Sequence, residues 1–172
     1  CGPIASVDSL AKHLGLPTEH LIEIAQNSAS HWRQGPDLVK PDGSIRKTNS
    51  ATQQLKDVHT RVKFKILRKT FYPDYLYGSL PKTLEQGVRN HIANAELHAG
   101  QRLIISADIK GYFPSVDPVV VHGIWQGFYP FAHDVAEVLT KLSTYKNEMP
   151  QGWGPSSYLA QLGFYDTQHD VD

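Results

Sequence analysis

The sequence predicts a single α+β unit in which helices dominate and the strands are few and short. Three observations support this class: apolar residues recur at helical spacing in several stretches, an Asp-Gly pair divides a short segment, and one apolar run is rich in β-favouring residues. The 172 residues, 40% hydrophobic and 20% charged, have the size and composition of one folded domain. No repeat or linker-like stretch divides the chain.

Two short helices are expected near the start of the chain, over residues 7–14 and 19–29. Ser6 and Thr18 stand where N-caps are needed, and both are residue types that cap helices well. The apolar stripe of the second helix consists of Leu21, Ile22, Ile24 and Ala25.

The next stretch predicts a hairpin followed by a long helix. Residues 37–46 are expected to form a β-hairpin, because the Asp42-Gly43 pair supplies the positive φ angles that a tight turn requires. Residues 52–69 place apolar side chains at helical spacing, and Tyr72-Pro73 ends that helix. Its apolar stripe consists of Leu55, Val58, Val62 and Ile66.

The second half is expected to alternate helices with one strand. A helix over residues 84–99 ends at Gly100, and residues 103–108 predict a buried strand because they are mostly Leu, Ile and small residues. The inward residues of the 84–99 helix are Val88, Ile92 and Ala95. Further helices are expected from Asp117-Pro118 onward, over 132–142 and over 156–169.

The 17 basic residues are balanced by 17 acidic residues, so the formal net charge is zero. This balance argues against a large surface for nonspecific nucleic-acid binding. Residues 56–69 nevertheless carry a run of cations, which fits a nucleic-acid groove or, more often, a solvated helix face. The lone Cys1 excludes an internal disulfide and a Cys-rich zinc site. No apolar run reaches the ~18 residues of a membrane span. We expect a cytoplasmic protein with no membrane partner.

The chemistry is expected where the 103–108 strand ends on Asp108. A strand can deliver a carboxylate to the edge of a sheet, where a metal ion reaches it, although an Asp before a turn also commonly caps that turn. About forty residues later, Gln151 and Gly152 stand in a loop before the last expected helix.

Two segments, Asp108 to Ser115 (DIKGYFPS) and Pro150-Gln151-Gly152, resemble signature blocks of reverse transcriptases, most closely the bacterial retron and group II intron branch. The resemblance implies the fingers and a partial palm of a right-hand polymerase, with a hairpin and a short antiparallel sheet. Residues 1–35 would be an N-terminal helical segment, 36–100 a fingers-like region and 101–172 the partial palm. The family's aromatic-x-Asp-Asp hairpin does not occur before the chain ends, so we expect the N-terminal portion of a longer enzyme, inactive alone.

The implied activity is RNA-directed DNA polymerisation, in which deoxynucleoside triphosphates are added to the 3′-hydroxyl of a DNA or RNA primer on an RNA template. The resemblance makes Asp108 the catalytic residue and assigns two Mg²⁺ ions, with Mn²⁺ as the substitute, to Asp108 and the carbonyl of Ile109. Backbone N–H groups of Lys110, Gly111, Tyr112 and Phe113 would bind the triphosphate.

The resemblance also assigns side chains around the nucleotide. The ring of Phe113 would exclude a ribose 2′-hydroxyl. The alternative for both Phe113 and Tyr112 is a plug in the core beneath the turn, and for Tyr112 the two roles are equally good. Gln151 and Gly152 would contact the incoming nucleotide. Arg46, and less surely Lys40, would fold over the triphosphate, with solvated hairpin cations as the alternative.

A looser match assigns Gly78, Lys82 and Arg89 to the template strand. The family has a small residue where this chain has Trp153, so the resemblance points to a divergent, retron-like branch with a role in antiviral defence. Two other functions stay open: a catalytically inactive polymerase-fold module that binds nucleic acid or protein, and an untemplated nucleotidyl transferase. The sequence leaves the oligomeric state undetermined.

Overall fold

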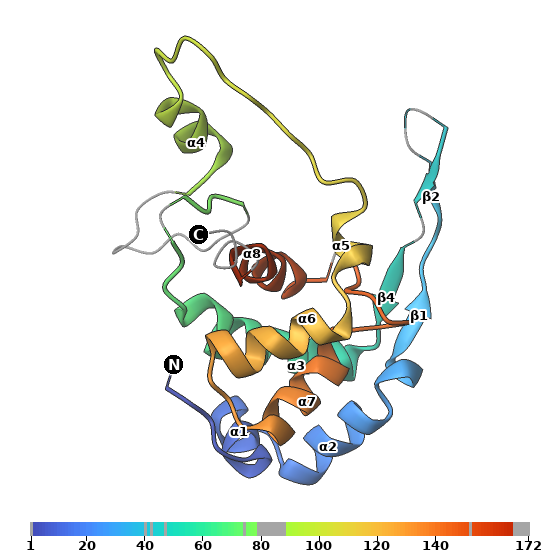
Figure 1. Ribbon diagram of the computed structural model, residues 1–172. Helices are drawn as coiled ribbons and strands as arrows, with labels where there is room; N and C mark the ends of the chain where they lie inside the picture. Colours follow the sequence, from blue (N-terminus) through green and yellow to red (C-terminus); the bar gives the residue numbers. More distant parts are fainter. Residues whose placement is uncertain are drawn as a thin grey trace.

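The computed structural model describes residues 2–39, 41, 43–46, 48–73, 75–78, 89–151 and 153–166, and consists of a helical body with an extended β arm at one side (Figure 1). The α-helices are α1 (Val7–Leu14), α2 (Thr18–Gln26), α3 (Gln53–Lys65), α4 (His91–Leu97), α5 (Tyr112–Ser115), α6 (Pro118–Gly123), α7 (His133–Ser143) and α8 (Ser156–Asp166). The strands are β1 (Trp32–Gln34), β2 (Leu38–Val39), β3 (Ile45–Arg46) and β4 (Asn49–Ala51). Short helical turns cover Ser28–His31 (η1), Leu67–Lys69 (η2) and Ile124–Phe128 (η3).

The two N-terminal helices form nearly as predicted. The side chain of Ser6 accepts a hydrogen bond from the N–H of Ser9, so Ser6 caps α1, and Gly15 ends this helix with a φ of 71°. The predicted cap at Thr18 is wrong, because α2 already begins at Thr18 and Pro17 stands at the cap position. The side chain of proline has no acceptor atom, so α2 begins without a side-chain cap.

The predicted hairpin is confirmed. Strands β2 and β3 pair antiparallel, with Leu38 opposite Arg46, and Gly43 between them has a φ of 78°. The chain pairs a second time closer to the body, where β1 and β4 place Trp32 opposite Ala51. The two pairs follow one another along the arm (Figure 1). This arrangement fixes the arm to the helical body through the end that contains Trp32.

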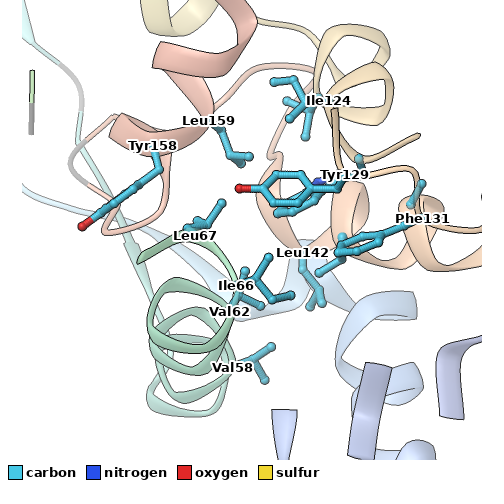
Figure 2. Close-up of a cluster of buried hydrophobic side chains, with 14 of the residues drawn as sticks. Val58, Val62, Ile66, Leu67, Ile124, Tyr129, Phe131, Leu142, Tyr158 and Leu159 are labelled. Carbon is cyan, nitrogen blue, oxygen red and sulfur yellow. The ribbon is translucent and has the colours of Figure 1, made fainter. Parts of the chain in front are cut away.

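Helix α3 supplies one wall of the core. Its predicted stripe is buried, and Figure 2 shows Val62 and Ile66 in one apolar cluster with Phe131 and Leu142. Burying each such side chain stabilises the fold by about 1.5–3 kcal/mol. The helix ends at Lys65, earlier than the predicted residue 69, because the chain tightens into η2.

Part of the cationic run on α3 is structural. Arg61 donates to the carbonyls of Leu14 and Gly15 at 2.9 and 3.0 Å, and Lys65 donates to that of His13 at 3.0 Å. These carbonyls lie at the C-terminal end of α1, where they accept no hydrogen bond from an N–H of the same helix. The two cations therefore attach α1 to α3.

The helix predicted over residues 84–99 is observed as α4, His91–Leu97. Its predicted inward residue Val88 lies outside the described residues, and the other two are exposed: Ile92 is 57% exposed and Ala95 also faces solvent. The inward orientation of Ile92 and Ala95 was therefore predicted wrongly. The helix stands apart from the body in Figure 1, so it has no core against which to bury them.

The predicted buried strand over residues 103–108 is also wrong. These residues adopt no regular structure, and Leu103 and Ile105 are 76% and 84% exposed. Figure 1 shows the segment as an extended stretch between α4 and α5. A strand needs a neighbour for its N–H and C=O groups, and no described strand runs beside this one.

The remaining helices confirm the prediction for the C-terminal half. Asp117 caps α6 by accepting from the N–H of Val120 at 2.9 Å, and Pro118 occupies the first turn. Helices α7 and α8 begin at His133 and Ser156, each within one residue of the predicted start. The last residues of the predicted 156–169 helix, from 167 on, lie outside the described residues.

The α+β class is confirmed by these helices and two small antiparallel sheets. Among the described residues, no helix combines the length and the apolar character needed to cross a membrane. The division at residues 35 and 100 stays a prediction.

Candidate functional site

An open pocket of about 1010 Å³ lies where the turn at α5 faces the arm, the loop before α8 and α8 itself. Five separate stretches of chain contribute to its lining. The lining residues are Ile45, Tyr75, Leu76, Ala107, Asp108, Ile109, Gly111, Tyr112, Phe113, Pro114, Glu148, Gln151, Ala160 and Gln161.

The structure brings the two predicted motifs together in this pocket. Asp108, Ile109, Gly111, Tyr112 and Phe113 line it together with Gln151, which lies about forty residues further along the chain. Lys110 is exposed and does not line the pocket. The Asp108 carboxylate, the Phe113 ring and the Gln151 amide therefore line one pocket, although they come from two stretches of the sequence.

The turn that carries Asp108 is attached to α8. Gly111 adopts a φ of 66°, a conformation that favours glycine, and α5 starts at the next residue. The hydroxyl of Tyr112 donates to the carbonyl of Ala160 at 2.6 Å. The rings of Tyr112 and Phe113 pack edge to face, with their centroids 6.2 Å apart. Burial raises the pKa of Tyr112, so its hydroxyl keeps the proton that it donates. Tyr112 thus has an anchoring role in the structure.

The loop with Gln151 is attached on both sides. The N–H of Met149 donates to the carbonyl of Val116 at 3.0 Å, and the Ser156 hydroxyl donates to the carbonyl of Pro150 at 2.6 Å. Both Met149 and Ser156 are buried. The first bond links the loop to the segment between α5 and α6, so the two motifs are connected through the backbone as well as through the pocket.

Arg89 lies inside the protein and is only 5% exposed. Its guanidinium donates to the carbonyls of Tyr72 and Leu76 at 3.0 and 2.9 Å and to that of Pro73. These bonds hold the segment that supplies Tyr75 and Leu76 to the pocket wall. The predicted contact of Arg89 with a template is untested, and this geometry gives the residue a structural role.

Gly78, also predicted to face the template, lies next to the pocket. A Cβ atom on Gly78 would stand 2.5 Å from the Nε2 atom of the lining residue Gln161. The absence of a side chain therefore lets the chain approach α8 closely at this point.

Several predicted residues cannot be placed. Lys40, Lys82 and Gly152 lie outside the described residues. The backbone of Arg46 is described as part of β3, next to the lining residue Ile45, but its side chain is not.

Sequence reasoning missed Tyr75, Leu76, Glu148 and Gln161 as lining residues. Glu148 stands two residues before Pro150, so its position beside the second motif was an available signal. The other three carry no local pattern that indicates a pocket.

The donor atoms fit part of a site for a hard divalent cation. Asp108, Ile109 and Glu148 all line the pocket. The carboxylates of Asp108 and Glu148 and the backbone carbonyl of Ile109 are oxygen ligands of the kind that Mg²⁺ prefers. Within the described part of the chain, no group of three or more His, Cys, Asp or Glu residues could hold a metal ion. The described residues therefore supply a partial ligand set.

Comparison with known proteins gives relatives of one kind, although no family model matches the chain. The chain is 31% identical to Retron Se72 reverse transcriptase of Salmonella heidelberg and 25% identical to Retron Ec48 reverse transcriptase of Escherichia coli, in each case over 98% of its length. A match over 40% of the chain is 36% identical to Retron Ec86 reverse transcriptase of Escherichia coli. The chain spans 43% of the length of each of the first two relatives and 21% of the third.

Proposed function

Because the chain is a relative of retron-type reverse transcriptases and corresponds to their N-terminal portion, we propose that it supplies the fingers and the partial palm of an RNA-directed DNA polymerase. The observation that carries this proposal is the pocket in which the Asp108 turn meets Gln151. The function proposed for the whole protein is addition of deoxynucleotides to a primer 3′-hydroxyl, directed by an RNA template.

Asp108 and the Ile109 carbonyl would hold divalent ions, Mg²⁺ or Mn²⁺, together with carboxylates from outside the described residues. Such ions, when bound, would supply charge stabilisation to the attacking and leaving oxygens of a phosphoryl transfer. Asp108 suits this task because it lines the pocket and is exposed, so its carboxylate is open to a cation.

The other lining residues would bind the nucleotide. Backbone N–H groups over residues 110–113 would bind the triphosphate, and the half-buried Phe113 ring would lie against the sugar. Gln151 also lines the pocket and offers both a donor and an acceptor there. The arm places Ile45 at the pocket, and the neighbouring Arg46, with Lys40, would cover the triphosphate from that side.

The template strand would pass along the side of the pocket where Gly78 approaches Gln161. Lys82 would contact its phosphates, which position a strand without reading its sequence. For Arg89, the three hydrogen bonds to the chain's own carbonyls favour support of this wall over direct contact.

The alternative function is a polymerase-fold module that binds nucleic acid or protein without catalysis. The two functions differ in their response to divalent ions, because only a polymerase requires them for incorporation.

Primer extension by the full-length protein tests the proposal. We expect incorporation of deoxynucleotides on an RNA template with Mg²⁺ or Mn²⁺ and none with a chelator. Asp108→Asn keeps the shape of the side chain but removes its charge, so it should lower the rate by at least about 10³-fold with unchanged stability. The matched control is Asp8→Asn, at an exposed position in the first turn of α1. Incorporation that survives Asp108→Asn would refute the assigned site, and no incorporation by the wild type would favour the binding module.

A further inference from the structure

Four aromatic rings pack behind the loop that carries Gln151, and we call them the ring cluster: Trp32, His59, Tyr145 and Trp153. The rings of His59 and Trp153 meet edge to face, with centroids 4.3 Å apart and an interplanar angle of 71°. Trp32 stacks on Tyr145 at 5.5 Å and approaches His59 at 5.8 Å. The cluster therefore joins side chains from β1, α3 and both sides of the Glu148–Gln151 stretch.

His59 is the hydrogen-bonding centre of this cluster. It is 3% exposed, and its Nε2 atom lies 2.9 Å from the carbonyl of Leu142, near the end of α7. A carbonyl only accepts, so Nε2 carries the proton and Nδ1 of the neutral ring is an acceptor. The indole N–H of Trp153 donates to that Nδ1 atom. One neutral imidazole thus connects a helix end to the residue that follows the Gln151 motif.

The cluster is attached to two walls of the pocket. Trp153 lies two residues after the lining residue Gln151. Tyr145 and Glu148, another lining residue, exchange backbone hydrogen bonds of 2.9 and 3.2 Å. Trp32 belongs to the end of the arm that joins the helical body, and the far part of the same arm brings Ile45 to the pocket.

We propose that Trp153, held by His59, is a positioning residue that sets the place of Gln151 relative to the arm and so determines the affinity of the site for the incoming nucleotide. This inference rests on the proposed function. Neither side chain lines the pocket, so both act through the loop and the arm. Their effect is expected on nucleotide binding more than on the chemical step.

The test is Trp153→Phe in the full-length protein, which keeps a ring but removes the N–H donor. The matched control is Trp125→Phe. Trp125 is fully buried away from the pocket lining, and its indole N–H has no hydrogen-bond partner within the described part of the chain. Both changes shorten a tryptophan to a phenylalanine, and the control removes the more deeply buried ring, but only Trp153→Phe removes a hydrogen bond next to the Gln151 loop.

Two measurements are made on each variant. Amide hydrogen exchange reports on residues 145–154 without requiring activity. Steady-state primer extension gives kcat and KM for the deoxynucleotide. We expect Trp153→Phe to speed exchange in this segment and to raise KM about three- to tenfold with kcat nearly unchanged, the size expected for one partly buried hydrogen bond. Trp125→Phe should leave both unchanged even if it lowers the melting temperature.

Unchanged exchange in Trp153→Phe would overturn the proposal, as would faster exchange with an unchanged KM, because the cluster would then be core packing alone. If the wild type incorporates no nucleotide, the proposed function fails instead. In that case the direct affinity for a deoxynucleoside triphosphate replaces KM, and equal affinity in wild type and Trp153→Phe overturns the positioning role. His59→Gln gives a second route to the same loss, since it disturbs the acceptor for Trp153 without altering the loop.

Discussion

Acidification is expected to destabilise the protein through His59. Burial lowers the pKa of His59 from 6.5 to about 3, and this effect outweighs the bond to the Leu142 carbonyl, which raises the pKa. In the unfolded chain the same imidazole takes up a proton as the pH falls through about 6.5. The folded state does not bind that proton until the pH approaches 3. The stability that depends on a neutral His59 is therefore complete above pH 6.5 and is lost as the pH falls toward 3.

The size of the effect follows from this difference in pKa. Each pH unit between the two pKa values lowers the free energy of unfolding by about 1.4 kcal/mol for one proton. Between pH 7.5 and pH 5.0, the part of the range that lies below the unfolded pKa of 6.5 and above the folded pKa covers about 1.5 pH units. Protonation of His59 in the unfolded chain should therefore lower the free energy of unfolding by about 2 kcal/mol.

Urea unfolding at pH 7.5 and pH 5.0 measures this effect in the full-length wild type and in His59→Gln. Glutamine does not titrate, so the variant should lose about 2 kcal/mol less than the wild type over this pH range, whatever its stability at pH 7.5. His91→Gln, at an exposed position on α4, is the control and should behave like the wild type. Equal pH dependence in wild type and His59→Gln would refute the argument, since it would mean that the folded protein takes up this proton as readily as the unfolded chain.

Two further predictions concern the pocket walls. If the Phe113 ring excludes a 2′-hydroxyl, Phe113→Ala should raise the use of ribonucleotides relative to deoxynucleotides about tenfold, equivalent to about 1.4 kcal/mol. The measurement is the ratio of kcat/KM for matched ribonucleotide and deoxynucleotide substrates. An unchanged ratio with lower stability would make Phe113 a core residue. Arg89→Met removes the guanidinium donor from three carbonyls, of which that of Pro73 keeps the N–H of Leu76, so urea unfolding should show a loss of about 3 kcal/mol. Intact stability together with a weaker, less salt-dependent affinity for RNA would instead place Arg89 on the template.

Local patterns in the sequence determined much of the secondary structure. The Ser6 cap, the β2–β3 hairpin with its positive φ at Gly43 and the stripe on α3 each depend on residues close together in the chain, and the structure has all three features. The two motifs that resemble reverse transcriptases are also short, so residue identity and order were enough to predict the relationship that the comparisons support.

Tertiary structure decided the features that depend on distant partners. The 103–108 segment has the composition of a strand, but a strand forms only where another backbone lies beside it. Arg89 has the charge of a phosphate ligand, yet carbonyls more than ten residues away bind its guanidinium inside the protein. The bond from Trp153 to His59 spans 94 residues. No periodicity or motif encodes such a contact, because it exists only after packing has brought α3, the end of α7 and the Gln151 loop to one point.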